Sequence, residues 1–454
     1  MLKKLLIACA VLITLIFAGG FWLYQQLGLS GSLQANVAVA TGMSAKLACS
    51  GYHLSKIPKQ GLFEDIDSYT PISSVLQLGF RDNGVTHATL LSTAIKTATY
   101  RPGLGCTLNI GDTSHLDELT MPDVTAGTEV WPIGNEVQDF DSQITELLKD
   151  IMQADNSAGL KTRALLVVQE GRIVGEQYAP GFDHKSQLLG WSMGKSITAM
   201  MLGRLYTQGQ LDVTEDHLFE AWQDDERQTI TIENLLQMSS GLDFDETYAP
   251  GSDATQMLFD AYSAPAVAMG SQLAHVPGSH FYYSSGTTNL LAQYMADKLG
   301  GPQALLDFLH REFYAPLNLA DTTFEVDPSG ILVASSYIYS SARDWAKLGL
   351  LMLNEGRHNG SQLIDSNWIE QSTSPNTSDN DPRYGYQFWL NSGADELRWS
   401  ELPEDAYAMS GNRAQTVMMI PSTNTVLVRL GWSSGRYPMP KNFRRILDQL
   451  GAGE

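Results

Sequence analysis

A serine and a lysine separated by two residues, Ser192 and Lys195, are the first candidates for chemistry in this chain. Apolar residues recur at helical spacing from Ile197 to Leu205, so the pair lies in the first turn of a predicted helix, on one face. A serine hydroxyl is a weak nucleophile until a neighbouring base takes its proton. A lysine amine can be that base when burial or nearby charge lowers its pKa. The helix N-terminus would also favour an oxyanion beside Ser192.

The same stretch allows other interpretations. A Ser-x-x-Lys sequence arises about once by chance in a chain of this length, and a capping serine with a solvated lysine would explain it as well. Residues 190–194 also fit the Gly-x-Ser-x-Gly turn of another hydrolase fold, which needs a buried strand before the serine and a late histidine. Here residues 186–189 make a poor strand, and the last histidine, His358, lies in a polar turn. A phosphate loop would need glycine at Leu189.

Tyr283 is a second candidate, because it lies in a loop just before a predicted helix and can carry a phenolic oxygen to Ser192. An unperturbed tyrosine pKa near 10 makes it a poor base at neutral pH. An adjacent Lys195 ammonium would stabilise the phenolate and correct that. Without the other motifs, an ordinary half-buried aromatic residue in a loop explains Tyr283 better.

Gly411 and Asn412 form a third candidate, just before a predicted strand at residues 416–420. Glycine lets the backbone approach a ligand closely. The N–H group of Asn412 can then pair with that of Ser192 as an oxyanion hole. Taken alone, this stretch is better explained as a glycine-containing turn before an edge strand.

Strand patterns occur at both ends of the region that holds these motifs. A β-hairpin is predicted at residues 164–178, and two more strands at residues 416–420 and 425–430. Amphipathic helices at residues 139–154 and 442–450 flank them, and the intervening segment is mostly helical. The pattern predicts an α/β fold in which an antiparallel sheet, built from both chain ends and flanked by helices, holds an inserted helical subdomain.

Together, the three motifs resemble the family of serine β-lactamases, penicillin-binding carboxypeptidases and esterases. The chain is most similar to the 6-aminohexanoate-dimer hydrolase branch, and the resemblance covers residues 139–454. It implies a β-lactamase/transpeptidase-like fold and an acyl-enzyme on Ser192. Lys195 would be the proton partner of Ser192, and Tyr283 the general base or acid. The N–H groups of Ser192 and Asn412 would form the oxyanion hole.

Two departures from the family pattern bear on the substrate. Met409 stands where β-lactamases carry a lysine that faces the substrate carboxylate, and Ser285 stands where the second motif usually ends in asparagine. Both favour an esterase or amide hydrolase over a penicillin specialist. Residues 244–248 resemble the substrate-contacting loop of the nylon-oligomer enzymes. By this resemblance Tyr248, Ser285 and Gly411 are candidate substrate-binding residues.

We therefore expect a serine hydrolase that acts on small-molecule esters or linear amides. D-alanyl carboxypeptidase or β-lactamase activity is the alternative, and a non-catalytic envelope binding protein on the same fold is another. A net charge of −21 disfavours nucleic acid as a partner. None of the nine histidines lies in His-Glu-x-x-His or is paired with cysteines at ligand spacing, so neither a metal nor another cofactor is expected.

The first 28 residues predict export. Lys3 and Lys4 precede an uncharged, mostly apolar run at residues 5–24, whose helix would be about 30 Å long and could span a bilayer. We favour an uncleaved anchor over a cleaved signal, with the bulk of the chain on the outer side of the membrane. The expected location is the bacterial cell envelope, at the periplasmic or extracellular face of the inner membrane.

Two cysteines remain outside the apolar run, Cys49 and Cys106. An even number in an exported chain predicts one disulfide, with two buried free thiols as the alternative. Residues 29–138 are thus predicted to be a disulfide-stapled extension and linker before a hydrolase domain at residues 139–454. Before the hydrolase domain, we expect a polar tether at residues 27–42 and one strand at residues 87–100.

Overall fold

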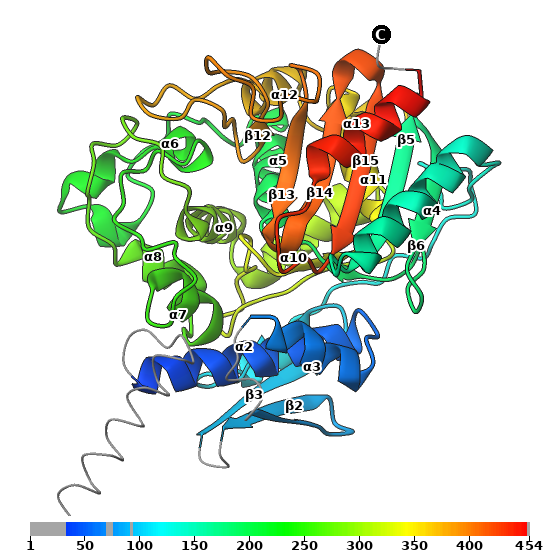
Figure 1. The fold of residues 1–454 in the computed structure, drawn as a ribbon. Coiled ribbons are helices and arrows are strands. Elements are labelled where there is room, and N and C mark those ends of the chain that lie inside the picture. Colours follow the sequence, from blue (N-terminus) through cyan, green and yellow to red (C-terminus); the bar gives the residue numbers. More distant parts are fainter. Residues whose placement is uncertain (1–32, 70–75, 91–93, 452–454) are drawn as a thin grey trace, which may run out of the picture.

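The computed structural model describes residues 33–69, 76–90 and 94–451 (Figure 1). The predicted membrane-spanning segment, residues 5–24, lies outside these residues. Among the helices of the described ranges, none is long and apolar enough to cross a membrane.

A six-stranded antiparallel sheet forms the centre of the larger part of the molecule (Figure 1). Its order is β12-β13-β14-β15-β5-β6, so strands from before and after the helical region pair directly, with Leu427 of β15 opposite Val167 of β5. The predicted antiparallel sheet built from both chain ends is confirmed. The strands are β5 (Thr162–Gln169), β6 (Arg172–Tyr178), β12 (Trp389–Leu390), β13 (Tyr407–Gly411), β14 (Gln415–Ile420) and β15 (Thr425–Gly431).

Helices cover both faces of this sheet. On one face lie α4 (Ser142–Ser157) and α13 (Met439–Gln449); on the other lie α5 (Met193–Thr207) and α11 (Ala342–Leu353). Successive strand residues point to opposite faces, so Leu165 and Val167 pack with α4 and α13, whereas Leu166 and Val168 join the main core. Burial of both faces explains why β5, β14 and β15 are mostly apolar rather than alternating.

The region between β6 and β12 is mostly helical, as predicted, and also contains a small sheet of order β7-β9-β8. Thr231 and Asn234 form a capping box that starts the short helix α6. The elements are β7 (Leu188–Leu189), α6 (Ile232–Leu236), α7 (Asp253–Phe259), α8 (Ala264–Met269), α9 (Ser285–Leu299), α10 (Pro302–Leu309), β8 (Thr322–Phe324), β9 (Ile338–Ser340), β10 (Arg357–His358), β11 (Ser361–Gln362) and α12 (Ser366–Ser372).

The part of the chain before α4, here termed the N-terminal segment (residues 33–138), packs against the helical region (Figure 1). Its helix α2 covers a four-stranded antiparallel sheet of order β1-β2-β3-β4, and α3 packs against α2. Cys49 of α2 and Cys106 of β4 form a buried disulfide. The elements are α2 (Leu33–His53), α3 (Lys59–Asp67), β1 (Leu76–Phe80), β2 (Val85–Leu90), β3 (Ala94–Arg101) and β4 (Gly105–Leu108).

Two expectations for this segment were wrong. Residues 33–42, expected to be part of a tether, begin α2, and residues 87–100 contribute to two strands, β2 and β3, rather than one. Helix α2 lies between the four-stranded β1-β2-β3-β4 sheet and α7. It is therefore buried on most sides and lacks the polar face that is typical of a surface helix. Residues 33–42 are mostly small and show no amphipathic pattern, so the sequence predicted a tether there.

Candidate active site

Ser192 sits at the turn between β7 and α5. It is the residue just before the first helical residue, Met193, and its side chain is partly exposed. Trp191 before it has a left-handed backbone (φ 49°) and a buried indole ring, which fixes the direction of the turn. Gly190 is required there, because a Cβ atom would lie 2.4 Å from the ring of Trp345. The local packing therefore presents Ser192 at the start of α5.

Lys195 lies one turn further along α5 and is almost fully buried. Its Nζ lies 3.2 Å from Ser192 Oγ and 2.9 Å from Ser285 Oγ, and it also donates to the carbonyl of Ser335 at 3.1 Å. Burial lowers the pKa of Lys195 to about 8, although the negative charge of Glu246 acts in the opposite direction. A substantial fraction of this amine is therefore neutral near pH 8 and able to accept a proton.

Tyr283 lies in the loop before α9, and its ring is 4.8 Å from Lys195 Nζ, measured to the ring centroid. Burial raises the pKa of Tyr283 well above its usual value; Tyr384 and Glu246 add to this, and a hydrogen bond with Ser192 opposes it. The expectation of a phenolate stabilised by Lys195 is therefore wrong. A buried phenol beside a carboxylate and another phenol keeps its proton, so this side chain is suited to proton donation.

Ser285 is fully buried as the first residue of α9. Its Oγ accepts a hydrogen bond from Lys195 and donates one of 2.6 Å to Glu246 Oε1, while its N–H donates to Glu246 Oε2 at 2.6 Å. The structure thus places Ser285 behind Lys195 and not in the pocket wall, which corrects the expectation of a substrate contact. It orients the amine instead.

Glu246 is a site residue that the sequence analysis missed. Burial raises the pKa of its carboxyl, and the charge of Lys195 and the hydrogen bonds from Ser285 oppose that rise. The residue lies in the same loop as Tyr248, which was identified by resemblance, and Tyr248 is half exposed. The only signal for Glu246 in the sequence was its place in that loop, since nothing in the chain order links it to Ser285.

Gly411 ends β13 at a close approach to the nucleophile turn. A Cβ atom on Gly411 would lie 2.1 Å from the carbonyl oxygen of Gly190, so only glycine lets the strand lie this close. Asn412 follows, and Arg413 and Ala414 have left-handed backbones with φ 62° and 65°. The structure thus places the third motif, Gly411 and Asn412, against Gly190, which is two residues before Ser192.

Ser192, Tyr283, Gly411 and Asn412 line one open pocket of about 790 Å³. Met409, by contrast, is fully buried in β13, so no cation occupies the position where related enzymes carry lysine. In the described part of the chain, no group of three or more His, Cys, Asp or Glu side chains is arranged to hold a metal ion. The pocket is lined by Ser68, Tyr69, Ser192, Glu246, Tyr248, Tyr283, Trp389, Ser410, Gly411, Asn412, Arg413, Ala414 and Ser433 to Gly435.

Comparison with known proteins agrees with this geometry. The model of the beta-lactamase family matches residues 144–451, about two thirds of the chain. The chain belongs to the beta-lactamase family. It is 24% identical over 288 residues to the 6-aminohexanoate-dimer hydrolase of Paenarthrobacter ureafaciens, a match that covers 59% of this chain and 72% of that protein.

Solved structures show the same fold. A Bacillus anthracis structure, provisionally named a 6-aminohexanoate-dimer hydrolase, has a TM-score of 0.58 at 18% identity and covers 74% of this chain and 92% of its own. A family VIII carboxylesterase has a TM-score of 0.55 at 13% identity, with 69% and 99% covered. The family confirms the predicted β-lactamase/transpeptidase-like fold and a serine hydrolase of the esterase, amidase or penicillin-binding type.

Proposed function

We propose that this member of the family cleaves small esters or linear amides through an acyl-enzyme on Ser192. The observation that carries the proposal is the buried Lys195 amine, which lies 3.2 Å from Ser192 Oγ with a pKa lowered to about 8. A serine beside a partly neutral, fixed amine is an activated nucleophile. A pure binding protein has no need of this arrangement.

The reaction begins when Lys195 accepts the Ser192 proton and Ser192 Oγ attacks the carbonyl carbon. The N–H groups of Ser192 and Asn412 stabilise the oxyanion. Tyr283 then donates its proton to the leaving alkoxide or amine, and the proton held by Lys195 returns the tyrosine to its neutral form. In the second half, water attacks the acyl group, its proton passes to this pair, and Ser192 leaves with a proton restored.

The aromatic walls of the pocket support a substrate with an apolar acyl or leaving group. Trp389 and Tyr283 are stacked with ring centroids 5.1 Å apart, and Tyr248 is half exposed beside them. Aromatic faces and edges bind apolar acyl or leaving groups. With Met409 buried in place of a lysine, Tyr248 and Gly411 remain the proposed substrate contacts.

Export to the bacterial envelope is part of the proposal. The apolar run at residues 5–24 supports an anchor, and the pairing of Cys49 with Cys106 fits an oxidising compartment. Residues 1–28 would then anchor the chain, residues 29–138 would form the disulfide-stapled extension and linker, and residues 139–454 would be the catalytic domain.

A substrate screen on the full-length protein tests the proposal. Nitrophenyl acetate and butyrate, linear amides, a D-Ala-D-Ala peptide and a cephalosporin would be compared at equal enzyme concentration. We expect the esters to turn over faster than the cephalosporin and the peptide, with Ser192→Ala inactive on all of them. Efficient cephalosporin hydrolysis with poor ester turnover would instead favour the β-lactamase alternative.

A further inference from the structure

The N-terminal segment contributes residues to the catalytic pocket. Ser68 and Tyr69, which directly follow α3, line the same pocket as Ser192. Both lie well before residue 144, where the match to the beta-lactamase family begins. The family relationship therefore gives these two residues no role, and their role has to be derived from their contacts.

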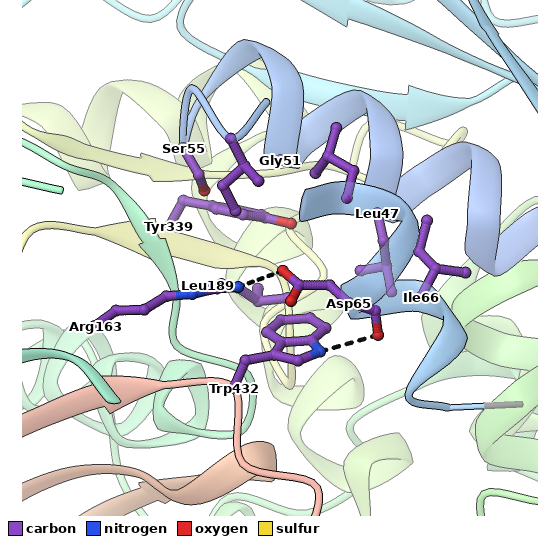
Figure 2. Close-up of a pocket in the computed structure, with 11 residues that line it drawn as sticks. Leu47, Gly51, Ser55, Asp65, Ile66, Arg163, Leu189, Tyr339 and Trp432 are labelled. Atoms are coloured by element: carbon purple, nitrogen blue, oxygen red, sulfur yellow. Dashed lines mark hydrogen bonds and ion pairs between the residues drawn. The ribbon is translucent and has the colours of Figure 1, made fainter. Parts of the chain in front are cut away.

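Helix α3 is fixed to the hydrolase part next to the nucleophile turn (Figure 2). The Asp65 carboxylate pairs with the guanidinium of Arg163 in β5, and the Trp432 indole N–H donates to the Asp65 carbonyl at 3.0 Å. Both Asp65 and Leu189, the last residue of β7, line the small cavity drawn there. Because Asp65 is buried and charge-paired, the chain that follows α3 has a defined position.

Tyr69 contacts both sides of the proposed oxyanion hole. On one side its ring lies edge to face with the ring of Trp191, the residue before Ser192, and the two ring centroids are 6.2 Å apart. On the other side the Arg413 guanidinium lies over the Tyr69 ring, 3.8 Å from its centroid. The Asn412 side-chain amide also lies 3.4 Å from the Tyr69 hydroxyl.

The turn that Tyr69 touches needs such support. Arg413 and Ala414 are consecutive non-glycine residues in the left-handed region, a conformation that persists only when its surroundings hold it. Arg429 holds the backbone from one side by donating to the carbonyls of Arg413 and Ala414 at 2.9 and 3.1 Å. The N-terminal segment holds the Arg413 side chain from the other, through the Tyr69 ring and a 2.9 Å hydrogen bond from the guanidinium to the Ser68 carbonyl.

We propose that Tyr69 is a positioning residue that fixes the Asn412–Ala414 turn, so that the N-terminal segment completes the active site. The proposal rests on the proposed function, in which the Asn412 N–H stabilises the oxyanion. Tyr69 itself takes no proton and touches no reacting atom. Its ring keeps Arg413, and through it the N–H of Asn412, in the orientation that the tetrahedral intermediate requires.

Steady-state kinetics of the full-length protein on nitrophenyl butyrate test this role. Tyr69→Ala removes the ring under Arg413, and kcat should fall at least ~10-fold with KM within ~3-fold, because the interaction lost acts on the oxyanion and not on substrate binding. Tyr69→Phe keeps the ring and should retain kcat within ~3-fold of wild type. Tyr52→Ala is the matched control, since it removes a tyrosine of the same segment that does not line the pocket.

A second variant keeps the test decisive if Tyr69→Ala does not fold. Arg413→Gln removes the partner of the same contact from the hydrolase side and should lower kcat to a similar extent. Combined with Tyr69→Ala, it should cost little more than either change alone, because the two residues act as a unit. Wild-type kcat in Arg413→Gln, or equal kcat in Tyr69→Ala and Tyr52→Ala, would overturn the inference while Ser192→Ala stays inactive. Full activity in Ser192→Ala would instead remove the proposed function.

Discussion

The amine of Lys195 has to lose its proton before it can accept one from Ser192. Its pKa is about 8 in the folded protein, so kcat/KM for a neutral ester should rise with pH and level off above about 8. The charge of Glu246 raises this pKa, so Glu246→Gln should move the rising limb to lower pH. A pH–rate profile from 6 to 10 measures both effects. A flat profile, or an unmoved limb in the variant, would contradict Lys195 as the base.

In the proposed reaction one proton passes from Lys195 to Tyr283, so the effects of changing the two residues should not be independent. Lys195→Ala and Tyr283→Phe should each lower kcat at least ~10²-fold, the scale of general acid–base catalysis. The double variant should lose much less than the product of the two single effects, because residues that act as a unit are non-additive. Single-turnover kinetics on all three variants would measure this. A loss of kcat in the double variant equal to the product of the two single losses would show that the two residues act independently.

The sequence did not predict the contacts between residues that are distant in the chain. Ser192 and Lys195 could be identified because they are three residues apart at the start of one helix, which places them on a common face. Glu246 meets Ser285 across 39 residues, and Tyr69 meets Asn412 across 343, so no local pattern connects either pair. The protonated state of Tyr283 was missed for a related reason, since the burial that raises its pKa comes from elements elsewhere in the fold.

At the scale of elements, a buried ion pair joins α2 to the helical region. Lys46 lies against Glu325, both are almost fully buried, and Glu325 also accepts hydrogen bonds from the Ser50 hydroxyl and the Cys106 N–H. Lys46→Met leaves a buried carboxylate without its cation and should lower the free energy of unfolding by about 3–5 kcal/mol. Urea unfolding followed by tryptophan fluorescence measures the change.

Two further variants serve as controls for this prediction. Adding Glu325→Gln to Lys46→Met should recover part of the loss, since the amide oxygen still accepts hydrogen bonds but carries no charge. Lys149→Met breaks an exposed pair with Glu146 and should change stability by less than about 1 kcal/mol. Equal losses in Lys46→Met and Lys149→Met would show that the buried pair does not hold α2 in place.

Elements with a clear local sequence pattern could be predicted from the sequence, and α2 could not. Strands β5, β6, β14 and β15 were predicted from their strand patterns and α4 from its amphipathic pattern, whereas β12 and β13 were not predicted. Helix α2 is enclosed by β2, β3, β4 and α7, so its residues show no polar side. Whether such a stretch of small residues forms a helix or a linker depends on the elements that surround it. Those elements come from distant parts of the chain, so no local sequence pattern indicates them.

For the whole molecule, the disulfide between Cys49 and Cys106 closes a loop with a sequence separation of 57. In the chain-entropy model, a loop of this size stabilises the folded state by about 4 kcal/mol. The double variant Cys49→Ala, Cys106→Ala should therefore unfold at a lower urea concentration than the wild type. Identical unfolding midpoints for the oxidised wild type and the variant would contradict a structural role for this bond.

The proposed export makes a separate prediction at this scale. If residues 5–24 anchor the chain, fractionated cells should hold the protein in the membrane fraction, with its bulk accessible to added protease. Thiol labelling after denaturation should find Cys49 and Cys106 oxidised. A cytoplasmic pool with both thiols free would contradict export while leaving the catalytic proposal untouched.

The central claim is that Ser192 carries the acyl group, and mass spectrometry of the labelled protein tests it most directly. The full-length enzyme would be treated with a slow ester or a phosphonate, digested and mapped. The account predicts a single adduct on the peptide that contains Ser192, absent in Ser192→Ala and slower to form in Lys195→Ala. An adduct on another serine, with Ser192→Ala still active, would contradict the account and leave the Ser192 turn as an ordinary helix start.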